Sequence, residues 1–197
     1  METMRIILKH NIISMIAIGI ILFSGGFVWG SDTPAKTNGI YDFLHRFHGH
    51  TCGGSLMGAR LGLAAKAALE RLGSVGKLKA EYFDHSCPVD GIQVTAGTTY
   101  GNGAITVHDN GVHRLILTDT KSGNQVEAIL SQKAIEKGEA TRELHKKYQT
   151  LPKESPERAN LEQEIDNIFD WLRTADESGV VTVKIQDSSA KFTYIYK

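Results

Sequence analysis

Two histidines and a cysteine at alternate positions are the residues of this sequence best suited to metal chemistry. His48, His50 and Cys52 occur at positions i, i+2 and i+4. If the backbone is extended here, alternate side chains point to the same side, so the three would share one face. Imidazole nitrogens and thiolates are ligands that transition metals bind well. The spacing therefore predicts a transition-metal site at this point in the chain.

A second cysteine, Cys87, extends the candidate ligand set. It precedes Pro88, a residue favoured at the first position of a helix. With His48, His50 and Cys52 it would complete a set of two imidazoles and two thiolates, which suits tetrahedral zinc. Copper and haem iron are alternatives, because imidazole and thiolate bind both. If one donor points away, three ligands and an open position remain, as in catalytic metal sites.

Four residues after the second cysteine are candidates for binding a cofactor. Asp90 could orient a ligating imidazole through a hydrogen bond. Alternatively, it is a solvated carboxylate that the N-terminus of a helix favours. Gln93 and Thr98 could line a pocket, and Tyr100 could close it.

The two cysteines also allow chemistry without a metal. In an oxidising compartment Cys52 and Cys87 could form a structural disulfide. The pair could instead be redox-active, because metal ligation and disulfide formation compete for the same thiolates. Gly53 and Gly54 let the chain turn into a helix over residues 56–72, which would place Cys52 just before the helix N-terminus.

The start of the chain predicts export. Arg5 and Lys9 precede an apolar run over residues 12–23, and small residues follow near Gly30. This is the plan of a secretory signal peptide over residues 1–30, cleaved at about Gly30/Ser31. The run is short for a membrane span of about 20 residues, although an uncleaved anchor is an alternative. We expect a periplasmic or secreted protein with no stable membrane insertion after cleavage.

Charge gives no case for nucleic acid as a partner. Cleavage removes Arg5, Lys9 and Glu2, which leaves 22 − 2 = 20 basic and 22 − 1 = 21 acidic residues among 197 − 30 = 167. A balance so close to zero does not favour binding to nucleic acid or to an anionic membrane surface. The length suits one domain with its own core. The sequence also lacks a serine nucleophile elbow, a dinucleotide fingerprint and a zincin helix motif.

The helices and strands expected from the sequence, which must position these residues, predict an α+β fold. In this fold an antiparallel sheet packs with helices. We expect a polar linker over residues 31–40 and one domain over 41–197, with a core over 41–130. Alternating apolar residues at 104–108 and 112–117 flank Asn110-Gly111, which predicts a β-hairpin. His108 and His113 would lie on the solvent side of this sheet. Further strands are expected at 79–83, 125–130, 180–185 and 192–196.

Two amphipathic helices are predicted over residues 131–149 and 156–175. In the second, Leu161, Ile165, Ile168, Phe169 and Leu172 recur at helical spacing and predict a packing face. His145 would lie on an exposed face of the first helix and have no chemical role. The helical pair and the closing strands complete the domain over residues 131–197.

Three segments together resemble the FmdE family, which is named after formylmethanofuran dehydrogenase. They are Phe47-His48-Gly49-His50-Thr51-Cys52, Gly58-Ala59-Arg60-Leu61-Gly62 and Cys87-Pro88-Val89-Asp90-Gly91-Ile92-Gln93. The family pattern is roughly F-H-G-H-x-C-P-G, then G-x-R-x-G, then C-x-x-D-A-I-Q, and the resemblance covers about residues 41–130. It implies an α+β metal-binding domain, commonly a homodimer. Arg60 would then pair with a carboxylate in the site or the dimer, or lie on a helix surface.

The sequence departs from the family pattern at three points. Gly53 stands where the family has proline, Thr98 where it has a third cysteine, and Asn102 where it has lysine. Chemistry that needs the third thiol or the lysine is therefore not expected here. The blocks that carry His48 and Cys87 are intact.

Three functions are compatible with these residues. The first is an exported protein that binds a transition metal or a small metal cofactor through its His/Cys site. The second is a metal-dependent enzyme, hydrolytic or redox, that uses an open coordination position. The third is a periplasmic thiol–disulfide protein in which Cys52 and Cys87 cycle.

Overall fold

A computed structural model of the chain describes residues 33–186, except for residue 75, and residues 192–194. The chain divides into the units Met1–Ser31 and Asp32–Lys197, and the second is described here. The predicted signal peptide, residues 1–30, lies outside the described residues. The predicted linker is corrected in part, because residues 33–40 begin the helix α1, Thr33–His48. No helix in the described part of the chain is long and apolar enough to cross a membrane.

One six-stranded sheet runs in the order β2-β1-β3-β4-β5-β6. Only β1 and β2 pair in parallel, and the other neighbouring pairs are antiparallel. The fold is therefore α+β with a mostly antiparallel sheet, as predicted. The strands are β1 (Leu78–Tyr82), β2 (Ile105–Val107), β3 (Arg114–Asp119), β4 (Gln125–Leu130), β5 (Val181–Gln186) and β6 (Phe192–Tyr194).

The predicted hairpin between β2 and β3 was wrong. The two strands do not pair, because β1 lies between them. His108 and Val112, on either side of the turn, donate backbone hydrogen bonds to Tyr82 and Phe83 at the end of β1. The Asn-Gly turn is present, with Gly111 at φ 66°. This turn connects β2 and β3, which lie on either side of β1 and are not neighbours in the sheet.

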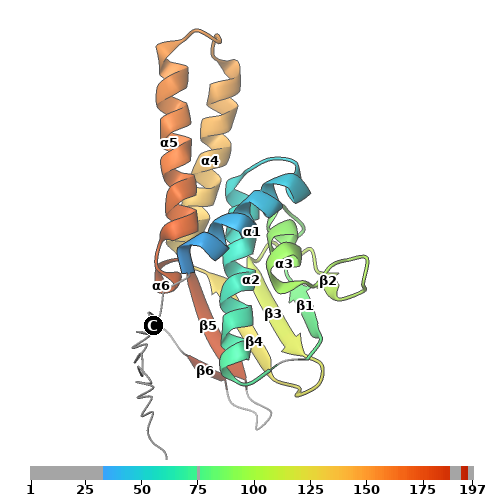
Figure 1. Cartoon of the computed structure of the whole chain (residues 1–197). Helices are drawn as coiled ribbons and strands as arrows, with labels where there is room; N and C mark the ends of the chain where they lie inside the picture. The colour runs from blue at the N-terminus through green and yellow to red at the C-terminus, as the bar shows by residue number, and fades with distance from the viewer. Residues whose placement is uncertain (1–32, 75, 187–191, 195–197) are drawn as a thin grey trace, which may run out of the picture. The chain divides into compact units, whose positions relative to one another are not determined.

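Helix α2 is the central helix of the unit (Figure 1). It packs against β3, β4 and β5 of the sheet and against the helices α1, α3, α4 and α5. Helices α4 and α5 form a pair that extends well beyond the sheet, and α5 buries all five predicted packing residues. The remaining helices are α2 (Gly53–Arg71), α3 (Pro88–Ala96), α4 (Gln132–Thr150), α5 (Pro156–Thr174) and α6 (Glu177–Val180).

Glycines allow α2 and α3 to approach very closely. A Cβ atom at Gly58 would lie 2.0 Å from the carbonyl oxygen of Pro88, and one at Gly62 would lie 2.0 Å from Oγ1 of Thr95. On α3, a Cβ at Gly91 would lie 2.3 Å from the backbone of α2. Contacts this short leave no room for any side chain. The close approach brings the start of α3 to the start of α2.

Arg60, in the second motif, has a structural role that the sequence did not predict. Its side chain is buried and donates hydrogen bonds to the carbonyl oxygens of Leu172 (2.8 Å) and Ala175 (2.5 Å). These carbonyls lie at the end of α5, where a helix leaves acceptors unpaired and carries partial negative charge. Arg60 therefore neither pairs with a carboxylate nor lies on a surface. It fixes α5 to α2.

Candidate metal centre

His48, His50 and Cys52 form one cluster. One ligand atom from each lies within 4.8 Å of the other two. The extended backbone predicted here was wrong, because His48 is the last residue of α1 and Gly49 reverses the chain with φ 85°. His48 ends α1, His50 lies in a bend and Cys52 directly precedes the next helix. The turn at Gly49 brings these three side chains together.

The separation of His48 and Cys52 fits a shared metal ion. Nε2 of His48 lies 3.5 Å from Sγ of Cys52. Zinc–nitrogen and zinc–sulfur bonds in tetrahedral geometry place those two atoms about 3.5 Å apart. An ion could therefore bind both atoms with little movement. The His50 ring lies beside that of His48, tilted by 33° with ring centroids 4.6 Å apart.

A hydrogen-bonded chain orients the His48 imidazole. Oδ2 of Asp90 lies 2.6 Å from Nδ1 of His48, and Nε2 of Gln93 donates to Oδ1 of Asp90 at 3.1 Å. The Tyr100 backbone N–H in turn donates to Oε1 of Gln93 at 2.8 Å. A carboxylate on the outer nitrogen fixes the ring and leaves Nε2 as the ligand atom, as in carboxylate–histidine–metal triads. Asp90 thus has the geometry for the orienting role considered from the sequence.

Cys52 is held by the helix that follows it. Its Sγ accepts a hydrogen bond from the backbone N–H of Ser55 at 3.3 Å, and its own N–H donates to the hydroxyl of Ser55 at 3.4 Å. This is a capping box in which sulfur replaces the usual hydroxyl. The helix therefore begins at Gly53, three residues earlier than predicted, and it fixes the direction of the thiol.

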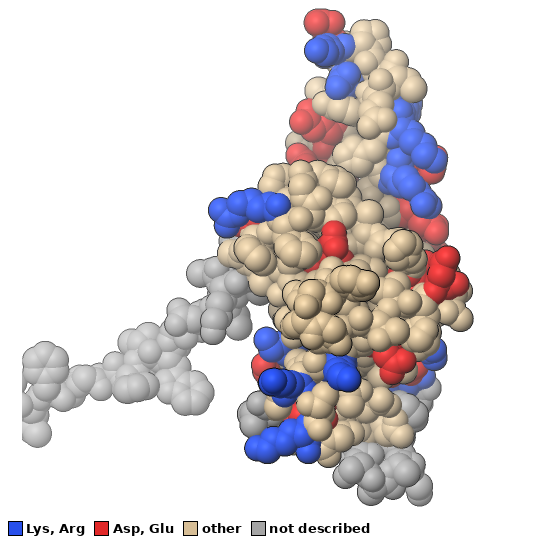
Figure 2. Space-filling view, turned by 90° about the vertical axis from the view of Figure 1, so that its right-hand side faces the viewer, with Lys and Arg blue, Asp and Glu red and all other residues tan. Residues whose placement is uncertain are grey.

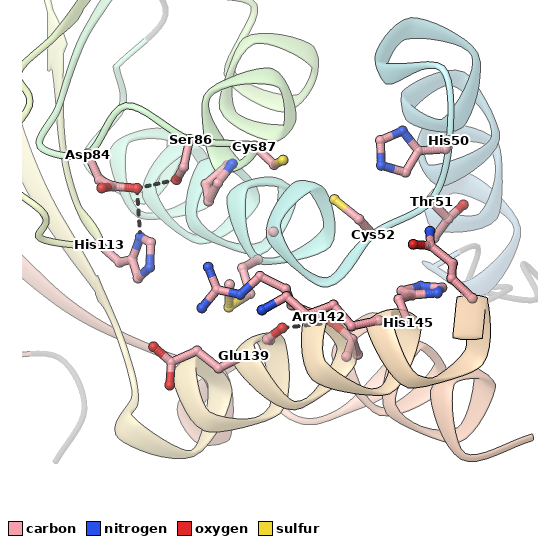
Figure 3. Close-up of a pocket in the computed structure, with 17 residues that line it drawn as sticks. His50, Thr51, Cys52, Asp84, Ser86, Cys87, His113, Glu139, Arg142 and His145 are labelled. Atoms are coloured by element: carbon pink, nitrogen blue, oxygen red, sulfur yellow. Dashed lines mark hydrogen bonds and ion pairs between the residues drawn. The ribbon is translucent and has the colours of Figure 1, made fainter. Parts of the chain in front are cut away.

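Cys87 lies beside the cluster but is not one of its three members. It directly precedes α3 and makes no side-chain capping hydrogen bond. A Cβ atom on Gly54 would lie 2.8 Å from Cβ of Cys87 and 3.8 Å from Sγ of Cys52. Figure 3 shows both thiols and the His50 ring directed toward one region. Burial, reinforced by the neighbouring Cys52, raises the pKa of the Cys87 thiol to about 11. Both cysteines are free, so the alternative of a structural disulfide is not realised in this structure.

The four cofactor candidates have different surroundings. Asp90 and Tyr100 line a cavity of about 770 Å³ together with His48 and Cys87, and Tyr100 is 82 % exposed. Gln93 is buried and positions Asp90. Thr98 is fully buried, its hydroxyl has no hydrogen-bond partner among the described residues, and it lines neither of the two cavities that border the cluster.

With this geometry established, comparison with known families identifies the domain. A family model described as "FmdE, Molybdenum formylmethanofuran dehydrogenase operon" matches residues 47–182. The chain belongs to the FmdE family. The match extends through α4, α5 and the start of β5, beyond the 41–130 region of the sequence resemblance.

A solved structure supports the FmdE fold. It is the crystal structure of a tungsten formylmethanofuran dehydrogenase FmdE-like protein from Syntrophus aciditrophicus at 1.90 Å resolution. It matches with a TM-score of 0.50 and 20 % identity, covering 77 % of this chain and 72 % of the other. A search of curated proteins found no match.

A second cavity of this FmdE-family chain contains residues to which the sequence assigned no role. It measures about 720 Å³ and is bordered by Cys52, Cys87, His113, Arg142 and His145 (Figure 3). The expected solvent-side position of His113 was wrong, because its side chain is only 22 % exposed and lines this cavity. His145 is half-buried and also lines the cavity, and its lack of a chemical role stays a prediction. A signal for it does exist in the sequence. The cavity-lining residues of α4 recur at helical spacing, namely Gly138, Glu139, Thr141, Arg142, His145, Lys146 and Gln149.

Proposed function

We propose that this FmdE-family protein binds a transition metal ion through His48, His50 and Cys52. The observation that carries the proposal is the 3.5 Å separation between His48 Nε2 and Cys52 Sγ, with Asp90 fixed on the opposite nitrogen of the ring. Cys87 is the candidate fourth donor. A set of two imidazoles and two thiolates favours zinc, with copper and haem iron as alternatives.

Metal analysis of the purified full chain tests this proposal. We expect one metal ion per chain by mass spectrometry, and loss of that ion in Cys52→Ser. His108→Gln is the matched control, because it removes a histidine that pairs with Glu81 outside the cluster. Metal retained at full stoichiometry in Cys52→Ser would contradict the proposal. Metal-free protein with a Cys52–Cys87 disulfide would favour the thiol–disulfide function instead.

A metal-dependent enzyme is the second candidate function. It is favoured by the cavity of about 720 Å³ that borders Cys52, because a substrate there would lie next to the ion. Bound metal would supply a Lewis acid. The variant Cys87→Ser separates the two functions. A hundredfold loss of affinity indicates a closed four-ligand site, whereas unchanged affinity indicates three protein ligands and an open position.

Export is also part of the proposal. It rests on the basic residues Arg5 and Lys9 ahead of the apolar run in residues 12–23. Expression of the full chain in a bacterial host should yield a periplasmic protein whose intact mass begins at Ser31. An uncleaved chain in the membrane fraction would indicate an N-terminal anchor instead.

We propose a homodimer as the assembled form. Phe43 and Phe47 are about half exposed on α1, with ring centroids 6.3 Å apart. Exposed aromatic pairs of this kind favour protein interfaces. Figure 2 shows a face of the molecule whose middle carries few charged side chains. Sedimentation of the mature chain should give twice its monomer mass, and Phe43→Ser should shift it toward the monomer.

A further inference from the structure

The cavity beside Cys52 contains an arginine whose terminal groups are free for a ligand. Arg142 lines it from α4, with a side chain that is 67 % exposed. Its only ion pair among the described residues is a 4.0 Å approach of Nε to Glu143. The two terminal nitrogens of the guanidinium have no partner in the described part of the chain. A planar guanidinium in this state is suited to bind a carboxylate or phosphate through two hydrogen bonds.

A second donor faces the same cavity from the sheet side. Nδ1 of His113 lies 2.7 Å from the hydroxyl of Tyr82, which is fully buried. Burial, reinforced by Asp84, raises the pKa of Tyr82. The phenol therefore keeps its proton and is able to donate a hydrogen bond to Nδ1. A neutral imidazole that accepts at Nδ1 carries its hydrogen on Nε2, and this is the tautomer that the proposal below requires.

The protonated form of His113 presents the same donor. Oδ2 of Asp84 lies 3.6 Å from Nδ1, and an imidazolium carries hydrogens on both nitrogens. Nε2 is therefore a hydrogen-bond donor in the protonated ring and in the neutral ring that accepts from Tyr82. Tyr82 and Asp84 hold the His113 ring in place beside the cavity.

Two acidic residues also line the cavity. Asp84 accepts a hydrogen bond from the hydroxyl of Ser86 and faces His113. The carboxylate of Glu139 is directed away from Cys52 and Cys87 (Figure 3). Lys146, a further cation at the cavity, pairs with Glu143 at 2.8 Å.

The rest of the wall suits the body of a small organic molecule. Met57 and Pro88 contribute apolar surface. The volume of about 720 Å³ lies within the range of small-molecule sites, roughly 300–1,000 Å³. Cys52 and His50 border the cavity on the side of the cluster. A ligand held by Arg142 would therefore face the candidate metal ligands.

We propose that this cavity binds a small organic anion whose carboxylate or phosphate is held by Arg142 and by Nε2–H of His113. The far end of the anion faces the His/Cys cluster. This second half rests on the proposed metal site, whereas the binding of the anionic group does not. The inference defines the chemical class of ligand that the protein would accept.

Calorimetry on the full chain tests the anion site with two probes, malonate and inorganic phosphate. We expect at least one probe to bind with a millimolar or lower Kd, and the tighter of the two indicates whether the natural ligand carries a carboxylate or a phosphate. Arg142→Gln should raise that Kd at least tenfold. Arg142→Lys should give an intermediate value, because it keeps the charge and loses the planar fork.

Lys147→Gln is the control for the loss of one positive charge. Lys147 lies on the same helix, does not line the cavity and pairs with Glu157. Its Kd for the probe should stay within twofold of the unaltered chain. An equal loss in Lys147→Gln and Arg142→Gln would overturn the proposal, and so would the absence of binding by both probes.

Metal content measured on the same samples separates this inference from the proposed function. Metal-loaded protein that binds neither probe overturns the anion site and leaves the metal site intact. Metal-free protein that binds a probe through Arg142 supports the anion site, even if the metal proposal fails. A lower Kd in the metal-loaded form than in the metal-free form supports contact between the anion and the ion.

Discussion

At the scale of single residues, Asp90 offers the clearest test of the proposed metal site apart from the candidate ligands. Its carboxylate fixes His48 at 2.6 Å. Asp90→Asn removes the charge and should weaken metal affinity about 10–100-fold. Competition with a chelator measures this, and Asp42→Asn, an exposed acid of α1, is the control. Equal affinities for the two variants would contradict the orienting role of Asp90.

Thr98 illustrates a residue whose polar group does not contribute to the site. It stands where the family pattern has a third cysteine, and its buried hydroxyl has no partner. Thr98→Val should raise the free energy of unfolding by about 1 kcal/mol, because an unsatisfied buried polar group is removed at nearly constant volume. Urea denaturation measures the change.

Thr95→Val is the matched control for this prediction. The hydroxyl of Thr95 is also buried, but it donates to the carbonyl oxygen of Gly91 at 2.7 Å. Its loss should lower the free energy of unfolding by about 1 kcal/mol. Two variants that shift stability in the same direction would contradict this account of Thr98.

The clustering of His48, His50 and Cys52 was predictable at this scale, whereas the cavity left only the helical spacing of its α4 residues as a signal. Residue type and spacing were enough to select His48, His50 and Cys52, because all three lie within five positions of the chain. The positions of His113 and His145 at the cavity depend on how α4 packs beside α2 and on the end of β1. Such long-range contacts leave little trace in local periodicity.

At the scale of elements, the contact between α2 and α3 determines the geometry of the site. Gly58→Ala would place a Cβ atom 2.0 Å from the backbone oxygen of Pro88. We expect a loss of stability of about 1–3 kcal/mol or more. Metal affinity should fall as well, since α3 carries Asp90. Thermal denaturation and metal titration measure the two effects.

Gly39→Ala is the control for the glycine substitution. A Cβ atom at Gly39 meets nothing within 4 Å, and the residue lies within α1. The change should leave metal affinity unaltered and stability equal or higher by up to about 1 kcal/mol, because alanine favours helices over glycine. Equal losses in both variants would show that the α2–α3 contact is not specific.

The helices were predicted better than the strand order. Amphipathic repeats and caps mark helices within the chain itself, and α4 and α5 formed within one residue of their predicted limits. The Asn110-Gly111 signal identified a turn correctly but gave the wrong strand pairing. The register of β1 explains this, because Ala80 and Tyr82 pair with Leu117 and Leu115 and all four side chains are buried.

At the scale of the whole domain, the proposed metal site would add a link between segments that already meet by packing and by the His48–Asp90 hydrogen bond. Its ligands lie at the end of α1 and before α2, and Asp90 connects them to α3. A ligand that binds only the folded state stabilises it, by about 4 kcal/mol at a free concentration 1,000 times its Kd. For a domain of this size we expect the Tm to rise by roughly 8–16 °C on metal loading.

The pH dependence of the metal-free domain offers a separate test of Cys87. Burial and the neighbouring Cys52 raise the pKa of Cys87 from 9.0 to about 11. The folded state then binds this proton more tightly than the unfolded state, so the stabilisation is complete below about pH 9 and is lost as pH rises to about 11. Equilibrium unfolding between these pH values should show the decline in stability in the unaltered chain and not in Cys87→Ser.

The same measurement on metal-loaded protein tests whether Cys87 is a ligand. A ligating thiol is ionised by the metal. The decline in stability should then disappear in the loaded protein, and metal binding at neutral pH should release a proton. A decline that persists in the loaded form would exclude Cys87 from the ligand set and leave three protein donors and an open position.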